Sequence, residues 1–430
     1  MKNRWLIALS AVGIHISIGS VYAWSVFNKP LASSFGWGGN EIAMTFSLAI
    51  LFLGLSAAIM GHFVEKRGPR ISGTVAACFW GVGLIGSGLA TSIGNLYLLW
   101  ISYGVIGGIG LGIGYITPVS TLVKWFPDRR GMATGLAIMG FGFGAMIGGP
   151  VFNYIITTIS LPATFYITGA FYLVLMLASA RYLERPPEGW MPESMKQEVE
   201  AGEREVPQDL TQQTANEAVK TAPFYGLWLM MFINISCGIA VIYAASPLAQ
   251  ESIGLTAAEA AAVVGLMALF NGIGRITWAS ISDYIGRPNT YIAFFAIQIV
   301  AFYLLPNITS VLLFQVVLYT ILTCYGGGFA TLPAYIGDLF GTKQLGAVHG
   351  YILTAWALAG LAGPQLAAYV RTTTGSYSLT LYIFAGFFCL ALVVSIFMRL
   401  YVYRTRAKLK QEKENNQKQT IVSKSEPVAA

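Results

Sequence analysis

The chain has 430 residues, of which 55% are hydrophobic and only 10% are charged. Soluble globular domains carry about 25% charged residues, so this composition excludes a soluble globule and predicts a polytopic membrane protein. The net charge of +7 includes a basic tail, which we expect to be solvated or to face lipid rather than to bind nucleic acid.

Twelve apolar runs are long enough to cross the hydrocarbon layer, which takes about 20 residues of helix. They form two sets of six on either side of a polar insert: 5–28, 42–63, 71–91, 95–118, 131–156, 163–183, 223–248, 258–281, 289–306, 310–334, 346–370 and 378–400. We predict an all-α fold with an N-terminal six-helix bundle at 1–183, a mobile linker at 184–222, a C-terminal bundle at 223–400 and a disordered tail at 401–430.

The basic residues predict the orientation of these helices. With a cytoplasmic N-terminus, 23 of the 26 Lys and Arg residues lie on the cytoplasmic side, Lys29 and Arg371 lie outside, and Arg275 lies within a span. This asymmetry follows the positive-inside rule, so we expect an integral plasma (inner) membrane protein with both termini in the cytoplasm. The first run lacks a small-residue cleavage site and is expected to be a retained helix.

The two halves repeat each other. Glu65–Gly68 (EKRG) follows the second run, and Asp283–Gly286 (DYIG) follows the eighth run 218 positions later. Phe126–Gly131 before the fifth run likewise corresponds to Phe340–Gly346 before the eleventh. Parallel six-helix repeats joined by a long loop are similar to the major facilitator architecture, in which the halves rock around a central site.

The charges near these repeated turns have two open interpretations. They are either gate contacts between the halves or solvated loop charges, and this applies to Glu65, Arg67, Arg70, Asp128, Arg129, Asp283 and Arg287. Glycines four residues apart let helices approach closely. We expect two such series to form the surfaces that rock: Gly104, Gly108 and Gly112 in the fourth run, and Gly140, Gly144 and Gly148 in the fifth.

Arg275 is the one Lys, Arg, Asp or Glu deep inside any apolar run. It precedes Asp283 by eight residues, which places it about 12 Å into a layer whose half-thickness is about 15 Å. An arginine at this depth costs about 2.5–3.5 kcal/mol. Since no span offers an acidic partner, we predict that Arg275 binds a transient anion, most naturally a carboxylate. Alternatively, backbone carbonyls or tyrosines satisfy the guanidinium, and it braces two helices.

Few polar groups accompany Arg275. Asn271 precedes it by one turn, within reach of the guanidinium or of a shared ligand. Aromatic residues at comparable depth are either cavity donors or packing residues; they are Tyr22, Trp24, Tyr115, Tyr243 and Tyr325. His15 in the first run is either a proton-coupling site or a neutral packing residue. The cysteines lie in apolar runs and predict neither a disulfide nor a metal site.

Several motifs resemble the oxalate/formate antiporter family of the major facilitator superfamily. The resemblance covers nearly all of the chain except its last 30 residues. Its motifs are Gly19–Ser25 (GSVYAWS), Gly114–Pro118 (GYITP), Lys124–Gly131 (KWFPDRRG), Arg185–Trp190 (RPPEGW), Asn271–Arg275 (NGIGR) and Leu353–Trp356 (LTAW).

This resemblance implies transport of small carboxylates. It implies that Arg275 holds the substrate carboxylate and that Tyr22 and Tyr115 line the cavity, and we add Phe141 to the lining residues. The family's oxalate exchangers place a lysine in the eleventh helix, where this chain has Trp356. An unpaired second carboxylate in a low dielectric is costly, so a monocarboxylate such as lactate, pyruvate or formate is favoured. Animal monocarboxylate transporters are also similar, but Asn271 replaces their aspartate.

We therefore expect a secondary transporter that works by alternating access, either as a proton symporter or as an antiporter that exchanges anions. An oxalate/formate exchanger is the first alternative and a transporter-like carboxylate sensor is the second. An enzyme is not expected, because no nucleophile, metal cluster or pair of carboxylates lies at mid-depth. The expected partners are the substrate, a proton or counter-anion and membrane lipid, with no cofactor, no metal and a monomeric chain.

Overall fold

The computed structural model describes residues 2–203 and 209–425, all in helices and their connections. The linker segment 204–208 and the tail segment 426–430, which the sequence expectations include, lie outside the described residues. Twelve of the described helices are long and apolar enough to cross a membrane. This finding confirms the predicted fold class and the number of spans.

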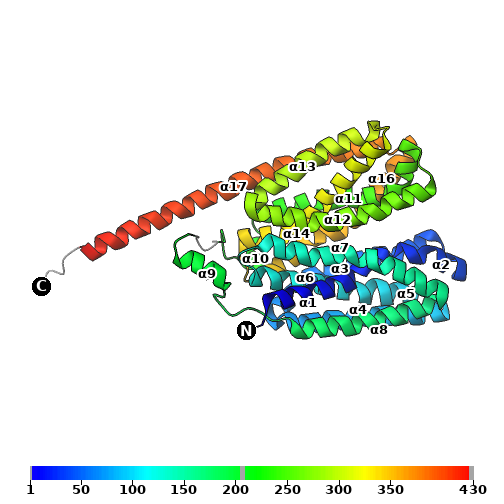
Figure 1. Ribbon diagram of the computed structural model, residues 1–430, viewed down its shortest axis with the longest axis horizontal. Coiled ribbons are helices and arrows are strands. Elements are labelled where there is room, and N and C mark those ends of the chain that lie inside the picture. Colours follow the sequence, from blue (N-terminus) through cyan, green and yellow to red (C-terminus); the bar gives the residue numbers. More distant parts are fainter. Residues whose placement is uncertain (1, 204–208, 426–430) are drawn as a thin grey trace.

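The first six spans form one bundle, drawn in blue to green in Figure 1. The first and fourth spans are not continuous α-helices: η1 is a 3-10 turn within the first, and η2 is a π-helical turn within the fourth. The elements are α1 Arg4–Gly19, η1 Ser20–Ala23, α2 Ser25–Phe35, α3 Gly39–Arg67, α4 Pro69–Ile93, α5 Leu96–Leu99, η2 Trp100–Gly107, α6 Gly108–Trp125, α7 Arg130–Thr158 and α8 Leu161–Tyr182.

The last six spans form the second bundle, drawn in green to red beside the first in Figure 1. The eleventh span is divided at Leu353 into α15 and α16. The elements are α11 Ala222–Ile253, α12 Ala257–Ile285, α13 Arg287–Leu304, η3 Leu305–Asn307, α14 Val311–Phe340, α15 Leu345–Ile352, α16 Thr354–Thr374 and α17 Ser378–Ser425. Both termini and the linker helices α9 (Glu193–Glu200) and α10 (Ala215–Ala218) lie at one end of the molecule, here called the linker end.

The repeated turns have the same backbone in both halves. Gly68 ends α3 with φ of 84°, and Gly286 ends α12 with φ of 83°. Side chains with a Cβ rarely adopt this region, so glycine lets the chain reverse directly into the next helix. The next helix begins with proline in its first turn in both cases, where the missing N–H costs nothing. The turn chemistry is therefore repeated along with the sequence.

The two glycine series do not form the surface between the halves, so that expectation is wrong. A Cβ added at Gly108 would collide with α3, and one added at Gly144 would collide with α1, which belong to the same half. The close approaches between halves are made elsewhere, for example by Gly54 against α16 and Gly135 against α12. Glycine spacing shows that a helix is tightly packed, but it does not identify the partner helix.

The halves are bonded to each other on one side of Arg275. Among the described residues, each hydrogen bond between the halves lies either at the linker end or within the first turns of α7. The bond farthest from the linker end along α7 joins Arg275 to the Ile138 carbonyl. No such bond joins the described residues of the two halves nearer the opposite end. In this structure, therefore, the halves are held closed at the linker end.

Part of the linker is attached rather than mobile. Beyond the undescribed segment, the N–H groups of Leu210 and Gln213 donate to the carbonyls of Asp338 and Phe340 at 2.8 and 2.9 Å. Those carbonyls belong to the last turn of α14, where a helix leaves backbone acceptors without intrahelical partners. The linker therefore caps this helix end.

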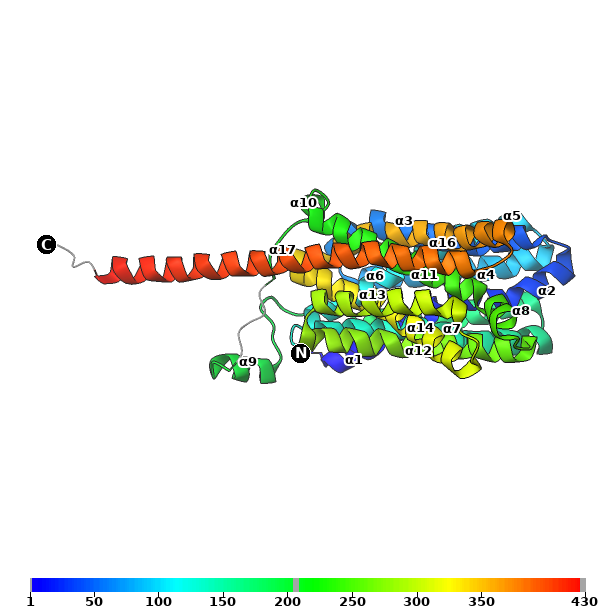
Figure 2. The ribbon, with the colours of Figure 1, turned by 90° about the horizontal axis from the view of Figure 1, so that it is seen from above.

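The prediction of a disordered tail at 401–430 is wrong for the described residues 401–425. The last span continues without a break as α17, which runs past the other helices at the linker end (Figures 1 and 2). The sequence beyond the membrane is rich in Lys, Glu, Gln and Ala, and these residues have high helix propensity. Low hydrophobicity therefore did not exclude helix here.

Candidate functional site

Arg275 is almost fully buried in α12, at 1% exposure. Its Nη1 donates to the backbone carbonyl of Ile138 in α7 at 2.8 Å, and its Nε donates to Asn271 Oδ1 at a longer 3.4 Å. No carboxylate pairs with it within the described residues, and its Nη2 makes no hydrogen bond to them. A guanidinium has five N–H donors, so the protein leaves part of this buried cation unsatisfied.

Aromatic rings from both halves surround the guanidinium. Arg275 lies 5.7 Å from the ring centroid of Phe141 in α7 and 5.5 Å from that of Phe329 in α14. Both distances are within cation–π range. The Trp356 ring contacts both phenylalanines, with centroids 5.7 and 4.8 Å apart. The arginine therefore lies where the halves meet, against apolar ring surfaces.

Two tyrosines from the first half complete this aromatic cluster. The centroid of Trp356 is 6.4 Å from that of Tyr22 in η1 and 5.3 Å from that of Tyr115 in α6. Tyr325 joins through Phe329, at 5.5 Å. The structure thus brings together the predicted lining residues Arg275, Asn271, Tyr22, Tyr115, Phe141, Tyr325 and Trp356.

The cluster contains buried hydrogen-bond donors that have no partner among the described residues. They are the hydroxyl of Tyr115, and the hydroxyl of Tyr22 and the indole Nε1 of Trp356, which interact with each other without forming a hydrogen bond of normal geometry. Leaving a buried donor unpaired costs about 1–3 kcal/mol, so such groups are usually bonded and each exception requires an explanation. Together with Nη2 of Arg275, these groups form a site that can donate hydrogen bonds to an anion with several acceptor oxygens.

The remaining predicted aromatics lie elsewhere. Trp24 packs on Tyr103 within the first half, with centroids 4.4 Å apart. Tyr243 is exposed on the surface of α11. Neither ring contacts the cluster around Arg275, so these two residues follow the alternative in which they are not cavity donors. Equal depth along a helix axis does not determine which face of the helix a side chain occupies.

The chain has a second buried histidine that the sequence analysis overlooked. His15 is fully buried, with Nδ1 2.8 Å from the Ala137 carbonyl and Nε2 3.1 Å from the Tyr115 carbonyl. A neutral ring donates to one of these carbonyls, and a protonated ring donates to both. His349 is equally buried in α15 and contacts the Tyr115 ring at 5.8 Å, on the opposite half. The sequence feature that could have identified His349 is its position near the start of the eleventh apolar run, where an ionisable side chain is unusual.

At each repeated turn, a carboxylate of one half accepts hydrogen bonds from backbone N–H groups of the other half. Glu65, at the end of α3, accepts a hydrogen bond of 2.7 Å from the N–H of Gly346 at the start of α15. Asp283, at the end of α12, accepts bonds of 2.8 Å from the N–H groups of Gly131 and Met132 at the start of α7. Carboxylates are favoured at helix N-termini by the free N–H groups and the helix dipole. These reciprocal bonds hold the linker end closed.

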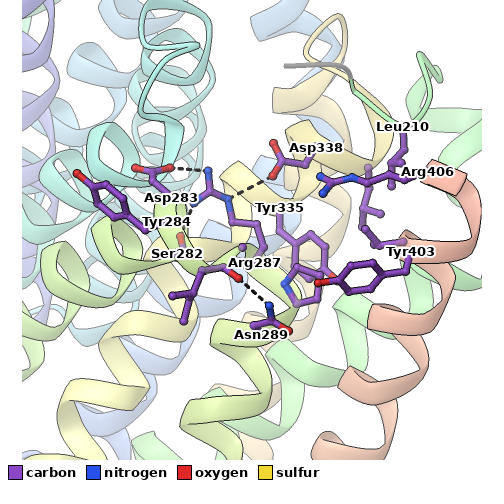
Figure 3. Close-up of a pocket in the computed structure, with 15 residues that line it drawn as sticks. Leu210, Ser282, Asp283, Tyr284, Arg287, Asn289, Tyr335, Asp338, Tyr403 and Arg406 are labelled. Carbon is purple, nitrogen blue, oxygen red and sulfur yellow. Dashed lines mark hydrogen bonds and ion pairs between the residues drawn. The ribbon is translucent and has the colours of Figure 1, made fainter. Parts of the chain in front are cut away.

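Arg287 lies between two carboxylates at the same end (Figure 3). Its Nη2 is 2.6 Å from Asp283 and its Nε is 3.3 Å from Asp338, while Nη1 donates to the Ser282 hydroxyl. Asp338 also pairs with Arg130 of the first half at 3.1 Å. A cavity of about 330 Å³ is lined by Ser282, Asp283, Arg287 and Asp338 and also by Leu210, Tyr335, Tyr403 and Arg406. Its lining shares no residue with the cluster around Arg275.

Within the part of the chain that the structure describes, the other predicted gate residues form no ion pair between the two halves. Asp128 pairs with Arg4 of its own half at 2.8 Å. Arg67, Arg70 and Arg129 are exposed and form no ion pair within the described residues, as the alternative of solvated loop charges predicted.

Arg130, which follows Arg129, is the buried residue of that pair and binds both Asp209 of the linker and Asp338. Sequence reasoning missed Arg130 and Asp338. The apolar run predicts that the tenth span ends at 334, whereas α14 continues to Phe340 and carries Asp338 inside the helix.

The chain can be compared with known proteins on this basis. Residues 9–364 and 227–429 match the profile of the Major Facilitator Superfamily. The chain belongs to this superfamily. It is an integral membrane transporter rather than an enzyme, and the resemblance stated from its motifs is confirmed at this level.

Its similarity to individual proteins is modest. It is 28% identical to the oxalate:formate antiporter of Oxalobacter formigenes over 87% of each chain. It is 24% identical to apicoplast pyruvate carrier 1 of Toxoplasma gondii over 88% of this chain and 86% of the relative. The crystal structure of the superfamily transporter FucP in the outward conformation matches with a TM-score of 0.70, at 14% identity, over 91% of this chain and 98% of that one.

Proposed function

We propose that this protein transports small monocarboxylates such as pyruvate, lactate or formate across the plasma (inner) membrane. The observation that carries this proposal is Arg275, a buried cation without an acidic partner among the described residues, beside buried donors that lack partners. Each free group at the site is a cation or can donate a hydrogen bond. A carboxylate supplies the negative charge and the acceptor oxygens that such a set requires.

The geometry suggests how the substrate is held. A carboxylate bound through Nη2 of Arg275 would bring its oxygens toward the hydroxyls of the cluster, while Asn271 keeps Nε oriented. The rings of Phe141 and Phe329 supply apolar surface for a short carbon chain. Neutralising the cation lowers the cost of enclosing it in a low dielectric, so binding favours closure of the halves over the substrate.

Trp356 favours a monocarboxylate over a dicarboxylate. Its indole fills the cluster position at which the resemblance places a lysine in oxalate exchangers, and it brings no second positive charge. A second carboxylate would lie unpaired among rings, which is unfavourable. The pyruvate carrier among the relatives supports this choice.

Alternating access would proceed through the linker-end bonds. We assign the linker end to the cytoplasm, following the distribution of basic residues. The described bonds of Glu65 and Asp283 across the halves must then break before the substrate is released inward. Arg275 bonds Ile138 of the other half, so the substrate site is coupled directly to the same movement.

Counterflow into proteoliposomes tests the proposal. Labelled C1 to C4 acids are offered to vesicles preloaded with unlabelled pyruvate, with protein-free vesicles and pyruvamide as controls. We expect saturable counterflow of pyruvate or lactate and none of the neutral amide. Absence of counterflow for every monocarboxylate, from protein shown to be folded, would contradict the proposal.

Oxalate/formate exchange is the second candidate, supported by the 28% identity to the Oxalobacter antiporter. A competition measurement separates the two. Strong inhibition of uptake by oxalate with weak inhibition by lactate would favour the exchanger, and the reverse order would favour a monocarboxylate carrier.

A further inference from the structure

Residues 209–216, the second end of the linker, form a strap that lies along the second half. Four hydrogen bonds of 2.7–2.9 Å fix this strap to the end of α14 and to the turn that follows it. The donors are the N–H groups of Leu210, Gln213 and Ala215 and the hydroxyl of Thr211, and the acceptors are the carbonyls of Asp338, Phe340 and Leu339 and the side chain of Gln344. The strap should therefore move with the second half.

The strap also reaches the first half, through the carboxylate of Asp209. Its Oδ1 lies 2.6 Å from Nη1 of Arg130 at the start of α7, and these two side chains are only 9% and 10% exposed. Gln212 donates to the other carboxylate oxygen at 2.8 Å and so holds the carboxylate in place. Solvent screens such a pair much less than an exposed one. Next to Arg130, the N–H of Gly131 binds Asp283, so the strap meets the first half at a helix start that already joins the halves.

A second contact of the strap acts through Tyr351 in α15. The Tyr351 hydroxyl donates to Asn216 Oδ1 at 3.3 Å and lies 3.0 Å from Nε2 of His62 in α3. A phenol has a single proton to donate. With that proton directed to Asn216, the Tyr351 oxygen accepts from the Nε2–H group of His62. Asn216 therefore orients a hydrogen bond that joins the two halves.

The first end of the linker is attached differently. Arg185 donates to the carbonyls of Val64 and Glu65 at the end of α3. The ring of Trp190 contacts that of Trp125 in α6, with centroids 4.8 Å apart. These partners belong to the first half. The linker is thus attached to a different half at each end, and Asp209 of the strap forms an ion pair with the half that the strap does not follow.

We propose that the strap is part of the gate that closes the halves at the linker end, with Asp209 and Asn216 as positioning residues. The strap follows the second half, whereas Arg130 and His62 follow the first. Separation of the halves must therefore break the Asp209–Arg130 pair and the bond that Asn216 orients. The linker then stabilises the closed state in addition to joining the two bundles. This inference holds for any substrate.

Asp338 does not make Asp209 redundant. Asp338 lies farther from Arg130, at 3.1 Å, and its side chain is 25% exposed. It also shares its charge with Arg287. Without Asp209, Arg130 would keep only a carboxylate that a second arginine already uses. Loss of the strap carboxylate should therefore weaken the closed state even though Asp338 remains.

Hydrogen exchange resolved to single amides tests the proposal on the purified full-length protein. Wild type is compared with Asp209→Asn, with Asn216→Leu and with the control Glu193→Gln. Glu193 is an exposed carboxylate in the same linker and forms no ion pair within the described residues. Asp209→Ser serves the same test if the asparagine variant is not monodisperse.

Two groups of amides distinguish a loosened strap from an opened gate. The amides of Leu210 and Gln213 report attachment of the strap to α14. Those of Gly131 and Gly346 report the gate, because their N–H groups bind carboxylates of the opposite half. When reclosing is fast, the exchange rate of a protected amide is proportional to the population of the open state.

We expect Asp209→Asn to accelerate exchange at Gly131 and Gly346 about 10-fold, because a largely buried arginine loses one of its two charged partners. Asn216→Leu should accelerate exchange at Gly346 about 3-fold, since one neutral hydrogen bond is lost. Glu193→Gln should exchange at the rates of wild type.

Faster exchange confined to Leu210 and Gln213 would overturn the proposal, because the strap would then detach without opening the gate. Unchanged exchange at Gly131 and Gly346 in the folded Asp209→Asn variant would also overturn it. Equal acceleration in Glu193→Gln would assign the effect to linker charge in general and refute a specific role of the strap. Since no substrate enters the measurement, the proposed function can fail while this inference stands.

Discussion

The linker-end contacts are duplicated between the halves, whereas the central site is not. Glu65 and Asp283 occupy equivalent places 218 positions apart, and each binds N–H groups of the opposite half. The same offset relates Arg275 to Ala57, a buried apolar residue. The shared part of the repeat therefore supports movement of the halves, and the part that differs carries the substrate chemistry.

This difference also explains the tolerance of each region for charge. At the linker end, the carboxylates lie beside arginines and helix N-termini that neutralise them. At the centre, Arg275 has a carbonyl, an amide and two rings instead. A region that only opens and closes can satisfy its charges internally. A region that binds a charged substrate leaves one charge to be satisfied by that substrate.

Replacing Trp356 by lysine should change specificity most. A second cation in the cluster would pair a second carboxylate, and a close buried pair contributes about 1.5–7 kcal/mol of coupling. We expect oxalate to compete with pyruvate at least 10-fold better in Trp356→Lys than in wild type. Competition for labelled pyruvate uptake measures this, with Trp356→Phe as the uncharged control. Unchanged oxalate competition in a folded variant would mean that Trp356 does not face the substrate.

Weakening either reciprocal carboxylate should open the linker end. Glu65→Gln and Asp283→Asn each replace a charged acceptor by a neutral one, which costs about 1–2 kcal/mol, or about 5–30-fold in the population of the closed state. Hydrogen exchange at the start of α15 and of α7 reports each contact separately. The control Asp128→Asn should leave both protected, since Asp128 pairs with Arg4 of its own half. Protection that is unaffected in both carboxylate variants would argue against a gate.

Removing a single unpaired hydroxyl should have a smaller effect. Tyr115→Phe should raise the KM for pyruvate about 10-fold, because one hydrogen bond to a charged group contributes about 1.5–3 kcal/mol, and the low end applies where other donors share the carboxylate. The melting temperature should not fall, since this hydroxyl has no partner in the described protein. Tyr243→Phe is the exposed control. A lower melting temperature with unchanged KM would make the hydroxyl structural.

The smallest effect is expected at Arg129, an exposed residue next to the buried Arg130. Arg129→Gln should change pyruvate uptake by no more than about twofold, as substitutions at surface positions change the free energy by about 0.5 kcal/mol or less. Uptake over a range of substrate concentrations provides the comparison with wild type. A loss comparable to that of the reciprocal carboxylate variants would place Arg129 in the gate after all.

Features that depend on one strong pattern in the sequence could be predicted from the sequence alone. Hydrophobic runs predicted the twelve spans, and the isolation of Arg275 in such a run identified the central cation. Phe329 gave no such signal, because one phenylalanine in an apolar helix looks like any other. The positions of His349 and Trp356 beside Tyr115 depend on how two halves meet, and helical periodicity within one chain segment contains no information about that contact.

Equilibrium binding to the purified protein tests the central claim most directly. The Kd for pyruvate is measured for wild type, Arg275→Gln and Arg275→Lys, each shown to be monodisperse and folded. The account predicts at least about 30-fold weaker binding in Arg275→Gln, since removing one partner of a buried charge pair costs about 2–5 kcal/mol. It predicts an intermediate Kd in Arg275→Lys, because lysine keeps the positive charge but cannot bind a carboxylate bidentately. Equal affinity in wild type and Arg275→Gln would contradict it.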